Sequence, residues 1–145
     1  MTTAAKITFG NKIFIAAAPT APTTIVAEVL SITPPKQTRE MQDATTHDSV
    51  AGAEEVIPEG TYNPGEIEVQ MHYIAGSTAD TAFIAALTSG ALQNLKIHAK
   101  SAAGFEAMTC SGYVTSYGPD EFPVKGKQAA TAMIKISGAQ TRAAV

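Results

Sequence analysis

Alternating apolar and polar positions predict a chain built mainly of strands. The cleanest alternation lies in the segment 65–75, and because successive side chains of a strand point to opposite faces, it predicts a strand with one buried face. We expect the buried face to consist of Ile67, Val69, Met71 and Tyr73, and the polar face of Glu66, Glu68, Gln70 and His72. The β-branched segment Thr24–Ile32 predicts another strand, which Pro34 and Pro35 end.

Further strands are predicted toward both ends of the chain. Lys6–Gly10 and Lys12–Ala16 are separated at Gly10-Asn11, a dipeptide suited to a tight hairpin. Strands are also expected over 93–100, 105–117 and 130–137, with turn residues between them. The last residues, 139–145, are expected to form a frayed tail.

One segment, 78–89, has the period of a helix instead of a strand. Its apolar stripe consists of Ala79, Phe83, Ala86 and Leu87. Ser77 or Thr78 can cap the start of the helix, and Gly90 can end it. Because an isolated helix of about three turns is marginally stable in water, we expect the stripe to pack on a sheet.

A long polar segment, from about Thr33 to Ala53, separates the early strands from the later ones. It has no sustained apolar period between Pro35 and Val50, so the sequence predicts a loop without regular structure. Loops of this length are uncommon in compact domains and are usually functional or disordered. The order of elements predicts a single, mainly β domain over residues 1–145, a β-sandwich or barrel with one flanking α-helix.

Composition argues against nucleic-acid-binding, disulfide-stabilised and membrane-spanning proteins. The formal net charge of −3 over 145 residues offers no basic surface for phosphates, so specific nucleic-acid binding is not expected. Cys110 is the only cysteine, which leaves no intrachain disulfide and fits folding in a reducing cytoplasm. No run approaches the roughly 18 apolar residues of a membrane span, and the N-terminus does not resemble a signal peptide. We therefore expect neither a membrane nor a secretory pathway to be involved.

The chain lacks the residue patterns of a catalytic or cofactor-binding site. The three histidines, His47, His72 and His98, are not at metal-ligand spacing, and no Gly-rich phosphate loop is present, so we expect no metal and no cofactor. His47 beside Asp48 could orient an imidazole for base catalysis, but without a nucleophile motif local hydrogen bonding is the favoured interpretation. The acidic residues from Glu54 to Glu68 leave open a hydrolase, although carboxylates two apart on a strand lie side by side and not across a cleft.

Several short segments carry a resemblance through their order along the chain. They are Glu28–Ile32, Pro34-Pro35, Thr38–Ser49, Ile57–Tyr62, the strand that starts at Gly65, Gly112–Ser116, Phe122–Val124 and Met133–Gly138. In this order they resemble the tail tube protein, or major tail protein, of bacteriophages with long, non-contractile tails. The resemblance covers nearly the whole chain.

The resemblance implies a structural virion protein and not an enzyme. In that family six β-sandwich subunits form a ring, the inner sheets join into a continuous barrel, and the rings stack into a tube for DNA ejection. The implied partners are further copies of the chain and other tail proteins, namely tape measure, terminator and baseplate or tip proteins, while DNA passes without specific binding. The implied location is the virion tail, after a stage in the host cytoplasm. Related contractile and gene-transfer particles have similar tubes, and the sequence favours the non-contractile type.

Two groups of residues are candidates for these implied roles. The loop residues expected to contact other subunits are Arg39, Glu40, Asp43, His47 and Asp48. Glu66 and Glu68 are the candidates for facing the lumen, where carboxylates would repel phosphates, and an outer-surface position for them stays open. The alternative function is a stand-alone β-sandwich binding module, for example for carbohydrate, but the loop offers no aromatic side chain for stacking on a sugar.

Overall fold

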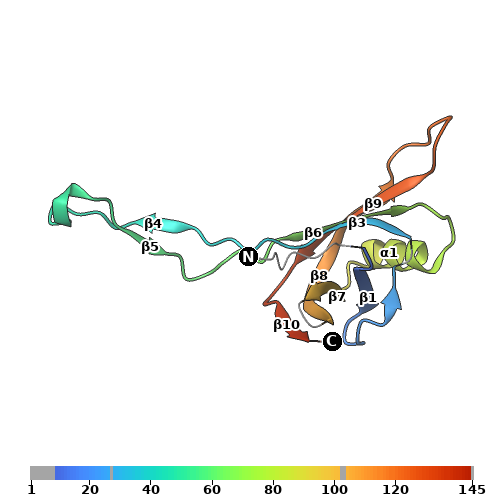
Figure 1. Ribbon diagram of the computed structural model, residues 1–145, viewed down its shortest axis with the longest axis horizontal. Helices are drawn as coiled ribbons and strands as arrows, with labels where there is room; N and C mark the ends of the chain where they lie inside the picture. Colours follow the sequence, from blue (N-terminus) through green and yellow to red (C-terminus); the bar gives the residue numbers. More distant parts are fainter. Residues whose placement is uncertain (1–8, 27, 102–103, 145) are drawn as a thin grey trace, which may run out of the picture.

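An antiparallel sheet of eight strands forms the body of the protein, and a hairpin arm extends from it (Figure 1). The computed structural model describes residues 9–26, 28–101 and 104–144. The strands of the body are β1 (Lys12–Ala17), β2 (Thr24–Ile25), β3 (Val29–Thr33), β6 (Glu66–His72), β7 (Gln93–Ser101), β8 (Gly104–Pro119), β9 (Ala129–Ile136) and β10 (Thr141–Ala144). Their order across the sheet is β2-β1-β7-β8-β9-β6-β3, and β10 also pairs with β8. The mainly β class with a flanking helix is confirmed.

Strand β8 joins two halves of the sheet. Its residues 104–112 pair with β7, and its residues 112–119 pair with β9, so the strand passes from one neighbour to the other at Gly112. A Cβ at Gly112 would overlap the Lys135 carbonyl oxygen of β9, so only glycine allows the two backbones to approach this closely. Gly112 therefore marks the place where the sheet curls around its core.

The inward faces of both halves converge on one hydrophobic core. Ile13 and Leu95 come from the neighbouring strands β1 and β7, Ile134 comes from β9 in the other half of the sheet, and each of these side chains is fully buried. From β6, Ile67, Val69 and Met71 are buried as predicted, whereas Tyr73, which follows the strand, is only partly buried.

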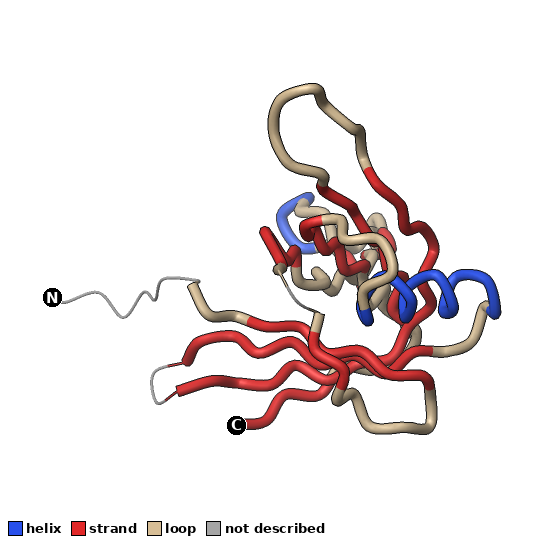
Figure 2. The backbone as a smooth tube through the Cα atoms, turned by 90° about the vertical axis from the view of Figure 1, so that its right-hand side faces the viewer, coloured by secondary structure: helices blue, strands red, loops and turns tan. Residues whose placement is uncertain are grey.

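The helix α1 (Thr78–Ser89) lies against one side of the curled sheet (Figure 2). The Ser77 Oγ accepts a hydrogen bond from the Asp80 N–H at 3.2 Å, and Gly90 ends the helix in the left-handed conformation, so both predicted helix ends are confirmed. Phe83 is the helix residue that enters the core most deeply. Leu87 was predicted to belong to the stripe, but it is 39% exposed. No helix among the described residues is long and apolar enough to cross a bilayer.

The predicted strand Thr24–Ile32 is wrong as a single element. It forms β2 and β3, which pair with opposite ends of the sheet, namely with β1 and β6. Between them Glu28 has a φ of 54°, and its carbonyl accepts a hydrogen bond from the His72 N–H at 3.0 Å. Because the two pieces satisfy different sheet edges, the chain has to turn where the sequence alone indicates a continuous strand.

The C-terminal end differs from the sequence prediction, and part of the element predicted at the N-terminal end lies outside the described residues. The tail was predicted to fray, but Thr141–Ala144 form β10 on β8, which satisfies backbone groups at residues 106–109. The second strand of the predicted N-terminal hairpin is β1. Its first strand falls mostly on residues 6–8, outside the described residues.

Candidate assembly surfaces

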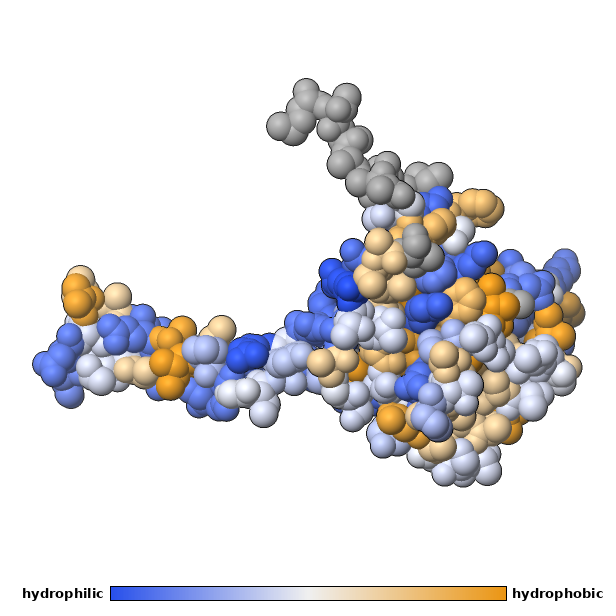
Figure 3. Space-filling model, turned by 90° about the horizontal axis from the view of Figure 1, so that it is seen from below, coloured by the Kyte–Doolittle hydropathy of each residue, from blue (hydrophilic) through white to orange (hydrophobic). Residues whose placement is uncertain are grey.

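The long segment between β3 and β6 is a hairpin arm and not an irregular loop. Its strands β4 (Met41–Asp43) and β5 (Val56–Pro58) pair antiparallel, and a single 3-10 turn, Val50–Gly52, lies at its tip. We define the arm as residues 38–63, because Thr38 and Asn63 form the bridge at its root. The arm extends well away from the body (Figures 1 and 3). The predicted loop Thr33–Ala53 therefore covers only the outgoing strand and the tip, and it misses the returning strand.

Hydrogen bonds within the arm hold its outer part in shape. The Thr45 Oγ1 accepts a hydrogen bond from the Glu55 N–H at 2.8 Å across the hairpin. The Asp43 carboxylate accepts a hydrogen bond from the Thr45 N–H at 2.9 Å, and this bond lowers the pKa of Asp43 from its ordinary value. These bonds replace contacts with the body, so the hairpin keeps its form at a distance from its own core.

The root of the arm is tied to the body through close backbone contacts. Thr38 and Asn63 exchange two backbone hydrogen bonds of 2.9 and 2.8 Å. Gly65 has a φ of +94°, and a Cβ there would lie 2.7 Å from the Lys36 carbonyl oxygen, so a larger residue would separate the two strands. The Lys135 Nζ donates a hydrogen bond to the Asn63 Oδ1 at 2.9 Å and links the root to β9. The direction of the arm is thus fixed by the sheet.

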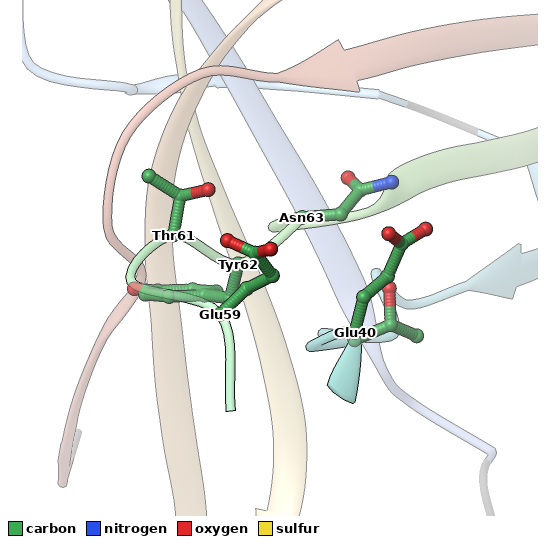
Figure 4. Close-up of a pocket in the computed structure, with 6 residues that line it drawn as sticks. Glu40, Glu59, Thr61, Tyr62 and Asn63 are labelled. Carbon is green, nitrogen blue, oxygen red and sulfur yellow. The ribbon is translucent and has the colours of Figure 1, made fainter. Parts of the chain in front are cut away.

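An open groove of about 370 Å³ lies at this root, between the two sides of the arm (Figure 4). The Glu59 carboxylate lies beside the Tyr62 ring, and the Glu40 side chain lies across the groove from it. The Arg39 Nη1 donates a hydrogen bond to the Glu59 carbonyl at 2.9 Å, and its guanidinium lies 5.4 Å from the Tyr62 ring centroid. The lining adds Thr38, Thr61 and Asn63. In the part of the chain that the structure describes, no group of three His, Cys, Asp or Glu could hold a metal ion.

The five loop residues predicted to contact other subunits lie in three places on the arm. Arg39 and Glu40 are at the root, where Arg39 binds its own chain. Asp43 is in β4, and His47 and Asp48 are exposed at the tip. Their contacts with another subunit stay a prediction.

Sequence reasoning missed the apolar side chains of the arm. Met41, Val56 and Ile57 are 57%, 59% and 55% exposed, and Val50 at the tip is 80% exposed. Hydrophobic patches are visible along the arm in Figure 3. The signal was present as Met41 and the pair Val56-Ile57, which lie in a segment that is otherwise polar. Grouped apolar side chains on a projecting element indicate a surface that another molecule covers.

The face of β3, β6 and β9 that points away from the core carries the two predicted lumen residues. Glu66 lies opposite Lys135, and Glu68 lies opposite Met133 and Thr33 in the ladders. Strand alternation on this face is as predicted, because the intervening Ile67 and Val69 are fully buried. The face is therefore polar and of mixed charge, and its position relative to a lumen stays a prediction.

The sheet ends in strands with a free edge. β3 and β2 lie at the two ends of the strand order, so within the described residues each pairs on one side only. Such edges present backbone N–H and C=O groups that can pair with a strand of another chain. The structure thus offers two kinds of assembly surface: open sheet edges and a projecting arm.

Cys110 and His98, two residues of the body with titratable side chains, lie in packed surroundings. Burial raises the pKa of the Cys110 thiol to about 11, so the side chain is a neutral thiol at physiological pH. His98 packs between Phe14 and Phe105, with ring centroids 4.8 and 6.1 Å away. Burial, with the nearby charges of Lys96 and Lys12, lowers the pKa of His98.

Comparison with known proteins decides the family. The family model of the lambda phage tail tube protein matches residues 11–143, which include the sheet, the helix and the whole arm. The chain belongs to this family. It is accordingly a structural tail tube protein of phage-like particles, as the resemblance implied. No curated protein matches the sequence.

Chains in solved structures of tails and of a baseplate share the fold. The tail of an empty gene transfer agent (GTA) particle, determined with C6 symmetry, contains a chain with a TM-score of 0.74 and 13% identity, covering 92% of this chain and 95% of that chain. The SPP1 tail tube has a TM-score of 0.68 and 12% identity, covering 91% of this chain and 75% of that one. The baseplate of the anti-feeding prophage (AFP) has a similar chain, with a TM-score of 0.74, 10% identity, and coverage of 99% and 97%.

Proposed function

We propose that the chain assembles into hexameric rings that stack into a tail tube, through which DNA is ejected. The observation that carries this proposal is the arm, a hairpin that leaves its own subunit with Met41, Val56 and Ile57 more than half exposed. A lone subunit gains nothing from exposing these side chains, whereas a stacked subunit can cover them.

Ring formation follows from the open edges of the sheet. The edge of β3 offers backbone groups that a strand of the next subunit can pair with, and closure of the ring removes every such edge. The similar gene transfer agent tail was determined with C6 symmetry, which supports six copies per ring. Closed rings of identical subunits also need the same pair of surfaces at every interface.

The lumen is proposed to be lined by the outward face of β3, β6 and β9. Glu66 and Glu68 would then face the DNA, and the one lysine of that face, Lys135, is engaged by Asn63. Carboxylates near a phosphate backbone repel it, so DNA would pass without specific binding. Arg39, Glu40, Asp43, His47 and Asp48 are proposed to make polar contacts between rings.

Other tail proteins are the proposed partners at the ends and inside the tube. Chains with this fold occur in the AFP baseplate and in the sheath/tube terminator of an extracellular contractile injection system, which supports baseplate and terminator contacts. A tape measure protein would occupy the lumen before DNA, and subunits would collect in the host cytoplasm before assembly. The family assignment favours this structural role over the binding module and the hydrolase.

Electron microscopy of the purified protein tests the proposal directly. The wild type is expected to form rings and tubes as its concentration rises. In a matched variant, residues 41–58 are replaced by Asn-Gly, because the Glu59 N–H already bonds to the Glu40 carbonyl at 2.9 Å and a two-residue turn can close that gap. This variant is expected to stay folded and to form no long tubes. A wild type that remains monomeric at every concentration, or an armless variant with tubes of normal length, contradicts the proposal.

A further inference from the structure

The charge of the chain is divided unevenly between arm and body. The arm holds six carboxylates and a single arginine, Arg39, which gives it a formal charge of −5 with His47 neutral. Its carboxylates are Glu40, Asp43, Asp48, Glu54, Glu55 and Glu59. The rest of the chain has nine basic and seven acidic residues, a formal charge of +2. An acidic projecting element thus belongs to a slightly basic body.

Three of the nine basic residues outside the arm lie together on one face of the sheet. We define the basic face as Lys12, Phe14, Lys96, His98 and Lys100, which alternate with buried residues along β1 and β7. In the ladder, Lys12 lies opposite His98 and Phe14 lies opposite Lys96. The Lys96 Nζ sits 5.0 Å from the centre of the Phe14 ring. The face therefore has an aromatic centre with lysines around it.

Carboxylates do not neutralise this face within the described chain. On β8 the residues that continue it are Phe105, Ala107, Thr109 and Ser111, which lie opposite its β7 positions. Glu106 alternates with these residues along β8, so its side chain lies on the opposite face of the sheet. Its Oε1 lies 3.8 Å from the Nε of Arg142. Burial lowers the pKa of His98, and the positive charges of Lys96 and Lys12 lower it further.

The arm cannot reach the basic face of its own subunit. In Figure 1 the arm leaves the body on the side away from β1 and β7, and the root contacts of Gly65 and Asn63 fix that direction. Any pairing of the two oppositely charged surfaces has to occur between copies. The other outward face, with Glu66 and Glu68, is a poorer receiver because its carboxylates would repel the arm.

We propose that the basic face of β1 and β7 receives the acidic arm of a second copy of this chain. The lysines meet the arm carboxylates, and Phe14 and His98 cover the apolar side chains of Met41 and Val56, which share one face of the hairpin. This combination of an apolar centre and a charged rim is the usual anatomy of a specific protein interface. The inference rests on the proposed tube and names the surface on which the arm docks.

Charge reversal on each surface, alone and together, tests the pairing. The face variant is Lys12→Glu/Lys96→Glu, and the arm variant is Glu54→Lys/Glu55→Lys. The control is Lys125→Glu/Lys127→Glu, which has the same formal charge as the face variant but changes exposed lysines of the β8–β9 connection. Tube formation is measured by electron microscopy and by sedimentation at equal protein concentration.

The face variant alone and the arm variant alone are each expected to raise the protein concentration needed for tube formation about tenfold or more, as for close charge pairs at other interfaces. The combined variant is expected to return to within about threefold of the wild type, because opposite charges face each other again. The control should assemble like the wild type. Assembly of the wild type should weaken from about 0.05 M to about 0.5 M salt, and the face variant should respond less.

The other possible results distinguish an error in the docking surface from an error in the proposed tube. If the face variant assembles like the control, or if the combined variant is not rescued, the docking surface is wrong while the tube itself stands. If the face variant loses binding to duplex DNA but assembles normally, the face belongs to nucleic acid and the inference is overturned. If the wild type forms no tubes, the proposed function fails and the inference fails with it. Circular dichroism checks folding, and Lys12→Gln/Lys96→Gln replaces the face variant if its fold is lost.

Discussion

The Tyr117 hydroxyl donates a hydrogen bond to the Asp80 Oδ1 at 2.6 Å and joins the end of β8 to the first turn of α1. Asp80 is only 6% exposed, and its second oxygen accepts a hydrogen bond from the Gly76 N–H at 3.0 Å. Below this pair the Tyr117 ring stacks on Phe83, with centroids 5.2 Å apart and an interplanar angle of 13°. One tyrosine thus fixes the helix by a polar and an apolar contact at once.

Replacing Tyr117 by phenylalanine separates these two contacts. The ring stack on Phe83 is kept, but the buried Asp80 carboxylate loses a hydrogen-bond donor. The free energy of unfolding is expected to fall by about 1–3 kcal/mol, measured by urea denaturation, because an unsatisfied buried acceptor is costly. Tyr113→Phe is the control: Tyr113 is 44% exposed, and its change is expected to stay within about 0.5 kcal/mol. Equal effects of both substitutions would contradict a role for the hydrogen bond.

Stability is expected to fall at alkaline pH because the buried thiol of Cys110 and the partly buried hydroxyl of Tyr117 hold their protons. Burial raises the pKa of Cys110 to about 11 from an ordinary 9.0, and burial with the Asp80 hydrogen bond raises the pKa of Tyr117. Unfolded chains release these protons first, so the stabilising effect of the thiol is complete below pH 9 and is lost as the pH rises toward 11, and that of the Tyr117 hydroxyl is complete below pH 10 and is lost at higher pH. At about 1.4 kcal/mol per pKa unit, the thiol accounts for about 2–3 kcal/mol. Urea denaturation from pH 8 to 11 should show a smaller loss in Cys110→Ala, and an identical slope would contradict the assignment.

Gly112 and Gly118 provide a matched pair on β8. A Cβ at Gly112 would overlap the Lys135 carbonyl, whereas a Cβ at Gly118 meets no atom within 4 Å. Gly112→Ala is expected to lower the free energy of unfolding by about 1–3 kcal/mol, because β8 and β9 must separate to admit the methyl group. Gly118→Ala should change it by less than about 0.5 kcal/mol. Thermal unfolding followed by circular dichroism distinguishes the two, and a tolerated Gly112→Ala would mean that the strands yield easily there.

Elements with a clear local period could be predicted, and elements made by distant pairing could not. The alternation around Ile67 and Val69 and the caps at Ser77 and Gly90 are local signals, and the structure confirms them. The break at Glu28 depends on which sheet edge each neighbouring piece pairs with, and no local signal encodes that choice. β10 likewise exists because β8 is long enough to pair with it beside β9.

The length of the polar segment predicted that it matters, but the predicted irregular loop is a β-hairpin in the structure. β4 and β5 have only three residues each, Met41–Asp43 and Val56–Pro58, too few to produce a visible period. Their pairing depends on hydrogen bonds such as that between Thr45 and Glu55, ten residues apart. From the sequence, only charged residues of the arm were predicted to contact other subunits. The exposure of Met41 and Ile57 is evident only from the structure.

The apolar side chains of the arm provide the last prediction. Met41 and Val56 occupy the same face of the hairpin, because Met41 lies opposite Pro58 and Val56 lies opposite Asp43 in the ladder. Met41→Ser/Val56→Ser removes their apolar surface where the side chains are more than half exposed, so the free energy of unfolding should change by less than about 0.5 kcal/mol per site.

Tube formation by this variant, in contrast, is expected to need at least about tenfold more protein, because each apolar side chain buried at an interface contributes about 1 kcal/mol or more. The control is Ile74→Ser/Ile84→Ser, which removes two side chains of similar exposure, 48% and 49%, from outside the arm. Sedimentation and electron microscopy at matched concentrations measure the difference. If both double variants impair assembly equally, general surface hydrophobicity and not the arm drives association; if neither does, the arm carboxylates alone carry the contact.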